Sequence, residues 1–519
     1  APGFYELACL DAKAGRFAEA LEHVNESILR QYQCMKARAL KENILRKLGR
    51  VKEAEELHKE SLKIDPLYDR QPEKINHNTL LELVIDLYEA GDYAQGITLA
   101  EKWVKQQNVS RQEDIYPLVY YYIAYGYQNL HRKENTEQAN CYMTMYVTLG
   151  ENAAADGCFP HRTEDYIVLK SLAEEYHLAM AYYYLGCLLY DRRVYDESIE
   201  DYEESILRSP DFPTVHRNLA LAYYNVKKLP QRAYEEMEKA FALDETDARV
   251  YLELDQLKKR LNVAVKERWS DMEKHFDLVE SRDDLYLEYV TLLNTLGEPE
   301  KALGLIKARK FHQWEGGEGK VAAQYLTALY QLAKAAVEKE DYAEAKELLL
   351  RAVGEYPHNL GEGKLESGQE NNLYYLLGLV QEKLGEAKDS FESLTRACCG
   401  ESEPVGMMYY NDQPPEMIYY QGLAYRMLGE EEQAVRRFQK LVDYGREHIR
   451  DDVKIDYFAV SLPDLLIFEE NLNERNRKHC LFMMSLGLKG LGRIDEAEKC
   501  AEELLAMDNA HQEIRVHDL

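Results

Sequence analysis

The chain has 519 residues, of which 46% are hydrophobic and 30% are charged, and its formal net charge is −29. Non-specific binding to DNA or RNA and docking on anionic membranes both depend on clustered Lys and Arg, so this balance speaks against nucleic-acid and membrane partners. It fits either a solvated acidic surface or attraction of basic partners. The 9 Cys are scattered without zinc-type spacing, and no apolar run reaches the length of a membrane span. We therefore expect no metal, no cofactor and a reducing, cytoplasmic environment.

The predicted elements begin with two helical hairpins at the N-terminus. A turn glycine and two small residues of the first hairpin return 34 positions later, as Gly15 and Gly49, Ala20 and Ala54, and Ser27 and Ser61. A helix pair repeated at this length indicates a solenoid, in which each pair buries its apolar face on the next. Because Ala1 is not Met and Phe4 already fits the repeat, we expect the chain to be a piece of a longer protein.

Further helix pairs follow in three predicted blocks of one continuous array. The blocks are residues 1–155, where the frame loosens toward the end, 156–309, where the spacing is regular, and 310–519. Long connectors interrupt the third block at 309–320, 357–369, 400–415 and 443–476. We expect an all-α, right-handed solenoid of about eleven or twelve helix pairs.

The turns between paired helices share one sequence pattern. A glycine is expected to end the first helix in a left-handed conformation at Gly49, Gly91, Gly297, Gly385, Gly429 and Gly492. A small residue follows on the second helix, where it lets the two backbones approach, as Ala54, Gly96, Ala302, Ala345, Ser390, Ala434 and Ala497.

A duplicated loop is the sharpest local signal. Gly-Glu-Gly-Lys occurs at 317–320, after Trp314 and Gly316, and again at 361–364. The first copy consists of Gly317, Glu318, Gly319 and Lys320. A glycine-rich turn before a helix can present backbone N–H groups to an anion, although the P-loop spacing is absent and Glu318 would repel phosphate. The other interpretation is a connector whose glycines permit tight packing around a buried Trp314.

Tyrosine is the second signal, with 40 Tyr against 12 Phe. Many occur in adjacent pairs on predicted first helices, where neighbouring positions diverge by about 100°. The repeat frame places Tyr182 inward and turns Tyr183, Tyr375 and Tyr419 toward the concave face. Such a face would offer flat, amphipathic area for peptides or sugars, whereas the plainer interpretation is that tyrosine fills wide spaces between helices.

Motifs for catalysis are missing. His-Glu-x-x-His, Gly-x-Ser-x-Gly and a dinucleotide fingerprint after a strand do not occur. We therefore name no catalytic residue and expect a protein that is not an enzyme.

The first helices of Leu-Gly-x-x-x-Tyr type and the Ala-led second helices resemble the tetratricopeptide superfamily over almost the whole chain. That resemblance implies a binding array. The chaperone-binding subclass carries Lys and Asn at the groove positions, where this chain has Tyr183, Tyr375 and Tyr419, so that mode of binding is not expected.

A narrower resemblance rests on the connectors. Phe-Pro-His-Arg at 159–162, the stretch at 311–319 and Ser-Leu-Pro-Asp at 461–464 are similar to the C-terminal array of large bacterial proteins. Those proteins join the array to an N-terminal β-rich domain of unknown function. The resemblance implies that this chain is the array alone.

Together these patterns predict a non-catalytic scaffold. Its concave face would recognise a protein segment, or the missing N-terminal domain in cis. The alternative is a glycan-associated protein, in which Trp314 or the groove tyrosines stack on carbohydrate. An exposed Trp314 beside an open pocket would favour the alternative, and a buried one would oppose it.

Overall fold

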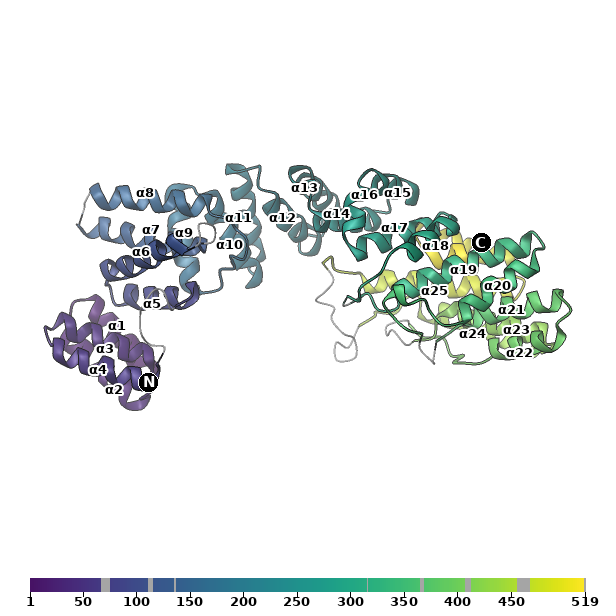
Figure 1. Cartoon of the computed structure of the whole chain (residues 1–519), viewed down its shortest axis with the longest axis horizontal. Coiled ribbons are helices and arrows are strands. Elements are labelled where there is room, and N and C mark those ends of the chain that lie inside the picture. The colour runs from purple at the N-terminus through teal and green to yellow at the C-terminus, as the bar shows by residue number, and fades with distance from the viewer. Residues whose placement is uncertain are drawn as a thin grey trace. The chain divides into compact units, whose positions relative to one another are not determined.

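The computed structural model describes residues 1–66, 75–110, 115–134, 137–314, 316–364, 368–406, 412–454 and 467–517. Within these ranges the chain forms helices and no strand, so the predicted all-α class is confirmed (Figure 1). The helices fall into two compact units, residues 1–219 and 220–519, whose border lies within one helix, α12.

Unit 1 consists of helical hairpins and one additional helix, α9. Its helices are α1 (Pro2–Lys13), α2 (Phe17–Arg30), α3 (Met35–Lys47), α4 (Val51–Ile64), α5 (His77–Glu89), α6 (Tyr93–Ser110), α7 (Pro117–Glu134), α8 (Glu137–Asn152), α9 (Thr163–Tyr176), α10 (Ala179–Asp191) and α11 (Tyr195–Arg208), followed by α12 (Pro213–Asn225).

Unit 2 continues the hairpins and ends in a short additional helix, α27. Its helices are α13 (Pro230–Leu243), α14 (Ala248–Arg260), α15 (Val265–Lys274), α16 (Phe276–Ser281), α17 (Asp283–Thr295), α18 (Pro299–Ala308), α19 (Lys320–Glu338), α20 (Tyr342–Val353), the 3-10 turn η2 (His358–Leu360), α21 (Asn371–Lys383), α22 (Ala387–Ala397), α23 (Pro415–Met427), α24 (Glu431–His448), α25 (Leu472–Gly490), α26 (Ile494–Met507) and α27 (Gln512–His517).

Neighbouring helices pack as pairs, as the sequence predicts. The pairs are α1–α2, α3–α4, α5–α6, α7–α8, α10–α11, α17–α18, α19–α20, α21–α22, α23–α24 and α25–α26, with α14 against α15 and α16. Between α12 and α13, the Arg232 guanidinium donates to the Tyr223 hydroxyl at 2.6 Å. These twelve pairs of the described residues agree with the expected number. The borders of the three predicted blocks stay predictions.

Glycine ends the first helix of many hairpins. All six predicted turn glycines have φ between 75° and 82°, the left-handed region in which a Cβ is disfavoured. The sequence analysis missed five turns that use other residues there, at φ between 55° and 61°. These residues are His177, Arg193, Lys228, Asn262 and Glu340. A side chain in this conformation costs stability, yet these five turns accept one. The glycine pattern alone therefore underestimates the number of hairpins.

Small residues on the two helices of a pair allow close contact. A Cβ added at Gly186 would lie 2.5 Å from the Tyr202 ring, so only glycine fits beneath that ring. The Ser198 hydroxyl donates to the Gly186 carbonyl at 2.7 Å, and Ser390 makes the same bond to Gly378 at 2.8 Å. Where the small residue is serine, it therefore also makes a hydrogen bond that joins the pair.

Candidate functional site

The two copies of the duplicated loop bind each other in unit 2. The carboxylate of Glu362, in the second copy, accepts from the backbone N–H of Gly319 at 2.7 Å and of Ala322 at 2.9 Å. These N–H groups belong to the first turn of α19, where carboxylates are favoured by the helix dipole. The position that the sequence offered to an external anion is therefore filled by the chain's own carboxylate.

The ring of Trp314 lies directly over Gly317. A Cβ added at Gly317 would come within 2.2 Å of the indole, and this glycine is buried. Trp314 itself is half-buried, while Gly316, Glu318 and Gly319 are exposed, as is Lys320. The loop is thus a packed connector, although its tryptophan is neither fully buried nor fully open.

Tyr183 does not face an open surface, so its predicted exposure is wrong. Its ring is 8% exposed and meets the Phe212 ring edge-on, with the centroids 5.0 Å apart. Its neighbour Tyr182, expected to point inward, is half-exposed and carries the Arg208 guanidinium 4.7 Å from its ring centroid. The exposure of the two tyrosines is therefore the reverse of the prediction. Phe212, from the connector after α11, covers the side of α10 that the repeat frame left open.

Tyr419 is also buried, which corrects the same prediction for α23. It is 6% exposed and packs against Tyr420 and Phe438 at centroid distances of 5.4 and 5.7 Å. Tyr375 is half-buried, and burial raises its pKa. Of the three predicted contact tyrosines, Tyr375 alone keeps a partly exposed ring.

Two tyrosines that were not predicted, Tyr330 and Tyr420, lie beside the predicted Tyr375 on the first helices of unit 2. Tyr330, Tyr375 and Tyr420 form a cluster, called here the tyrosine cluster. The ring of Tyr420 lies 6.2 Å from that of Tyr330 and 5.5 Å from that of Tyr375, and the hydroxyls of Tyr330 and Tyr420 are 2.5 Å apart. The sequence analysis missed Tyr330 and Tyr420, although the three positions are spaced 45 residues apart.

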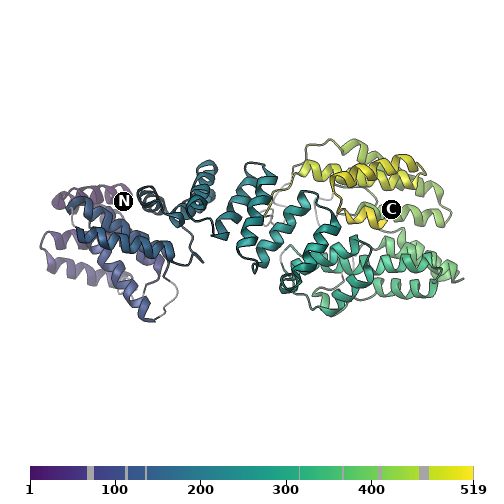
Figure 2. The ribbon, with the colours of Figure 1, turned by 90° about the horizontal axis from the view of Figure 1, so that it is seen from above.

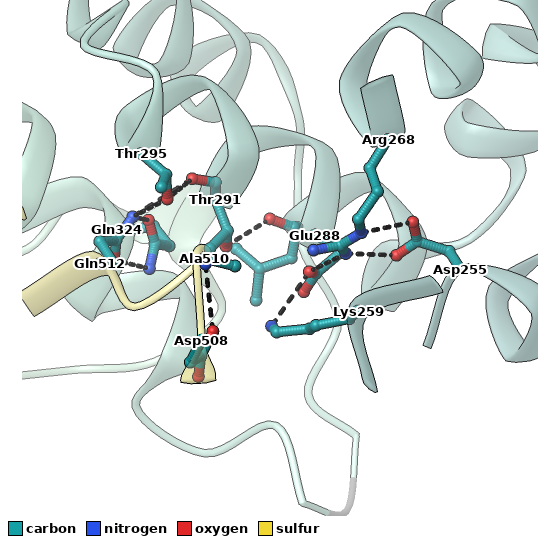
Figure 3. Close-up of polar contacts among 11 residues, drawn as sticks. Asp255, Lys259, Arg268, Glu288, Thr291, Thr295, Gln324, Asp508, Ala510 and Gln512 are labelled. Carbon is teal, nitrogen blue, oxygen red and sulfur yellow. Dashed lines mark hydrogen bonds and ion pairs between the residues drawn. The ribbon is translucent and has the colours of Figure 1, made fainter. Parts of the chain in front are cut away.

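The helix α27 packs against this face of unit 2. The Gln512 side-chain amide donates to the Thr291 carbonyl and the Thr295 hydroxyl, both at 3.2 Å (Figure 3). Gln512 and Gln324 also exchange amide hydrogen bonds of 2.8 and 3.1 Å. Both contacts come from first helices, α17 and α19. In Figures 1 and 2 the yellow C-terminal segment accordingly lies among the teal and green helices of unit 2.

The rest of α27 is held by apolar burial and by the tyrosine cluster. Ile514 and Val516 are 0% and 4% exposed. The Lys334 ammonium donates to the Val516 carbonyl at 2.9 Å. The His517 ring lies 5.4 Å from Tyr330 and 5.6 Å from Tyr420, and burial with the nearby Lys334 charge lowers its pKa to about 3. The first helices of unit 2 therefore already hold a peptide segment.

Two further contacts bring C-terminal segments onto the early helices of unit 2. The Asn509 side chain donates to the carbonyl of Asn262 at 2.6 Å, and its backbone N–H donates to the Asn262 side chain at 2.8 Å. Phe468 is fully buried against the Tyr224 ring at 5.1 Å, and its carbonyl accepts from Arg260 at 3.0 Å. These contacts anchor residues on both sides of the α25–α26 pair.

A buried ion cluster lies beside the α27 contacts (Figure 3). Arg268 donates to both carboxylate oxygens of Asp255, at 3.0 and 2.6 Å, and to Glu288 at 2.7 Å. Arg268 and Asp255 are almost fully buried. Burial alone would raise the pKa of Glu288, but Lys259 and Arg268 hold it at about 2. The cluster fixes α14, α15 and α17, so we assign it to the fold.

Charged side chains also connect first helices of unit 1. Lys36 lies 3.1 Å from Glu82 and 3.4 Å from Asp86, and Arg162 donates to Glu82 at 2.7 Å. Glu89 stands close to these carboxylates, and burial together with Asp86 raises its pKa to about 7. This face is polar and acidic where the corresponding face of unit 2 is aromatic.

No group of His, Cys, Asp and Glu within the described ranges is arranged to hold a metal ion. Over the same ranges, every helix is too short or too polar to span a bilayer. All nine cysteines lie in this part of the chain and are free thiols. The expected absence of a cofactor stays a prediction.

Comparison with known families identifies the helix pairs. Tetratricopeptide repeat models match residues 5–69, which cover α1 to α4, and residues 327–359 and 416–444 in unit 2. The chain contains tetratricopeptide repeats. Both units therefore carry them, and the fold is of the tetratricopeptide type. Stacked repeats of this kind form extended concave surfaces that bind partners.

Several solved structures align with most of the chain at low sequence identity. Yeast Tom70 is 12% identical, with 97% of this chain and 98% of that one covered and a TM-score of 0.25. The TPR domain of P58(IPK) is 10% identical, with 97% and 98% covered and a TM-score of 0.20. Human IFIT1, solved as a dimer with m7Gppp-AAAA, is 11% identical, with 82% and 88% covered and a TM-score of 0.26. At these values none of them assigns a ligand to this chain.

Proposed function

We propose that this chain is a non-catalytic scaffold that binds a segment of another protein on the first-helix face of unit 2. This face is defined by Thr291, Thr295, Gln324, Tyr330, Lys334, Tyr375 and Tyr420. One observation supports the proposal above the others. The face already holds the six residues of α27 through side-chain amide, backbone and ring contacts.

The chemistry of the face suits a peptide. Gln324 and Lys334 supply a paired carboxamide and an amine that reach backbone or amide groups. The tyrosine cluster supplies flat rings with hydroxyls, which bind peptide side chains at a small entropic cost. Tyr375 has the most accessible ring of the three. Tyr419, buried as it is, would support this face by packing beneath it, whereas Tyr183 is buried in unit 1 and lies outside it.

A photo-crosslinking experiment tests this function. The full chain carries benzoylphenylalanine in place of Tyr375, and the control carries it in place of the exposed Glu432. Both are incubated with lysate, and crosslinked peptides are sequenced by mass spectrometry. We expect one protein segment to crosslink at position 375 and not at 432. Equal, unselective crosslinking at the two positions would contradict the proposal.

The resemblance of the connectors suggests one specific partner, a β-rich domain at the N-terminal side of the same polypeptide. In that arrangement the crosslinked segment would come from this domain when the longer polypeptide is used. A cytoplasmic setting agrees with nine free thiols.

The half-buried ring of Trp314 keeps the carbohydrate alternative as a second proposal. A sugar would stack on the open side of the indole. The test is a glycan array probed with the full chain and with Trp314→Ala. Binding that disappears in the variant would support a carbohydrate partner, and an array without signal would remove this alternative.

A further inference from the structure

The helix α27 differs from the repeats in how it is buried. Gln512, Ile514 and Val516 are buried, while Glu513 and Arg515 between them are exposed. Successive helical residues are turned by about 100°, so Gln512 and Val516 lie on one side and Ile514 lies on nearly the opposite side. A helix that is buried on two opposite sides is enclosed between two walls. This is how a groove holds a ligand.

From its first residue to its last, α27 makes contacts of the kind by which a groove recognises a peptide. A carboxamide at its first position pairs with Gln324, two branched aliphatic side chains are buried, and a neutral imidazole at its last position meets Tyr330 and Tyr420. These contacts come from the first helices α17, α19 and α23, the face proposed above to bind a partner.

We propose that α27 is a displaceable internal ligand, which blocks this face until a partner segment of the same chemistry replaces it. The partner segment is a short helix with a carboxamide, branched aliphatic residues two and four positions later, and an uncharged aromatic or imidazole ring at the fifth. This inference rests on the proposed function and adds both its regulation and its recognition pattern.

The tether sets how tightly a free segment must bind before it displaces α27 from the unaltered chain. Residues 508–511 connect α26 to α27, and the Asn262–Asn509 contact holds this connector in place. A short tether gives an effective concentration on the order of millimolar. A competing segment therefore binds only when it is tighter than α27 or when the docking of α27 has been weakened.

The test uses the full chain with one substitution in α27. Ile514→Asp places a charge at a fully buried aliphatic position without changing the face itself. The matched control, Arg515→Asp, places the same carboxylate at an exposed position of the same helix. The probe is a fluorescein-labelled peptide with the sequence of residues 508–517, and its binding is followed by anisotropy.

We expect the probe to bind the Ile514→Asp chain at least tenfold tighter than it binds the unaltered chain or the Arg515→Asp chain. A probe that itself carries Ile514→Asp should bind none of them. In hydrogen exchange, the α27 amides should exchange freely in the Ile514→Asp chain while α14 and α19 keep their protection. In the unaltered chain, α27 should open more readily than α19.

Three outcomes would overturn the inference. A folded variant with a released α27 and no probe binding would mean that the face is merely covered. An α27 that stays protected in the variant would mean that other contacts hold it permanently. Loss of protection throughout unit 2 would make α27 a part of the core. If crosslinking at Tyr375 still identifies a partner in any of these cases, the proposed function stands and its regulation by α27 does not.

Discussion

The side chain of Glu362 accepts two backbone hydrogen bonds at the start of α19, from Gly319 at 2.7 Å and from Ala322 at 2.9 Å. Glu318 occupies the equivalent place in the other copy of the duplicated loop and is exposed. The same short sequence therefore acts once as a helix cap and once as the segment that is capped.

Replacement of Glu362 by Ala should lower the stability of unit 2 by about 1 kcal/mol, because two N–H groups lose a charged acceptor at a helix N-terminus. The measurement is the urea midpoint followed by circular dichroism. Glu318→Ala is the matched control and should change stability by less than about 0.5 kcal/mol. Equal effects of the two substitutions would show that the cap contributes nothing.

Replacement of Gly422 by Ala should destabilise the α23–α24 pair by about 1–3 kcal/mol. The added Cβ would lie 2.5 Å from the ring of Phe438, which is fully buried and has little room to move. Gly304→Ala in α18 is the control, because a Cβ there meets no atom within 4 Å. That substitution should be neutral or stabilise the helix by about 0.5–1 kcal/mol, since glycine is unfavourable within helices. A stable Gly422→Ala chain would contradict the close packing.

Replacement of Arg268 by Ala should cost about 3–5 kcal/mol, since it leaves the buried Asp255 carboxylate without its partner. Replacement of Arg436, whose ion pair with Glu432 is exposed, should cost less than about 0.5 kcal/mol. Thermal unfolding of both variants gives the comparison. Similar melting temperatures for the two would mean that the buried cluster is not needed for the fold.

Stability should fall as pH rises from 6.5 to 8, and Glu416 should account for part of this. Burial and the nearby Glu513 charge raise the pKa of Glu416 to about 8, so the folded chain keeps a proton that the unfolded chain has released. The unfolded state then binds fewer protons, and the free energy of unfolding decreases with pH. The single group contributes about 2 kcal/mol over this range.

Glu416→Gln should therefore flatten the pH dependence of the urea midpoint, whereas Glu498→Gln at an exposed position should leave it as it is. Both variants should keep some decrease of the urea midpoint with pH, because burial raises the pKa values of Glu89 and Asp201 to about 7. His479 and His517 have pKa values lowered to about 4 and 3. They therefore lower the free energy of unfolding only below pH 6.5, where the unfolded chain binds their protons. An unchanged slope in Glu416→Gln would disprove its role.

Sequence patterns predicted the local geometry of the hairpins well. Turn glycines and small helix-contact residues depend on backbone conformation and on neighbours a few positions away, so Gly429 and Ser390 could be assigned from spacing alone. Side-chain direction was less predictable. Whether Tyr182 or Tyr183 is exposed depends on Phe212, which enters from a connector that has no repeat pattern.

The occupant of the first-helix face could not have been predicted from spacing. Gln512 and its partner Gln324 are 188 positions apart, and neither belongs to a recognisable motif. One signal was available but not used, which is the 45-residue spacing of Tyr330, Tyr375 and Tyr420. It identifies three equivalent positions on consecutive first helices, and it would have named the tyrosine cluster correctly.

The contact between Asn262 and Asn509 spans 247 positions, and this has a consequence during protein synthesis. Repeat arrays can usually fold hairpin by hairpin as the chain leaves the ribosome, because each repeat needs only its neighbours. In unit 2 the helices α14, α17 and α19 receive their last partners only when residues 508–517 have emerged. Until then the nascent chain leaves this surface uncovered, and transiently exposed apolar surface of this kind is prone to aggregation.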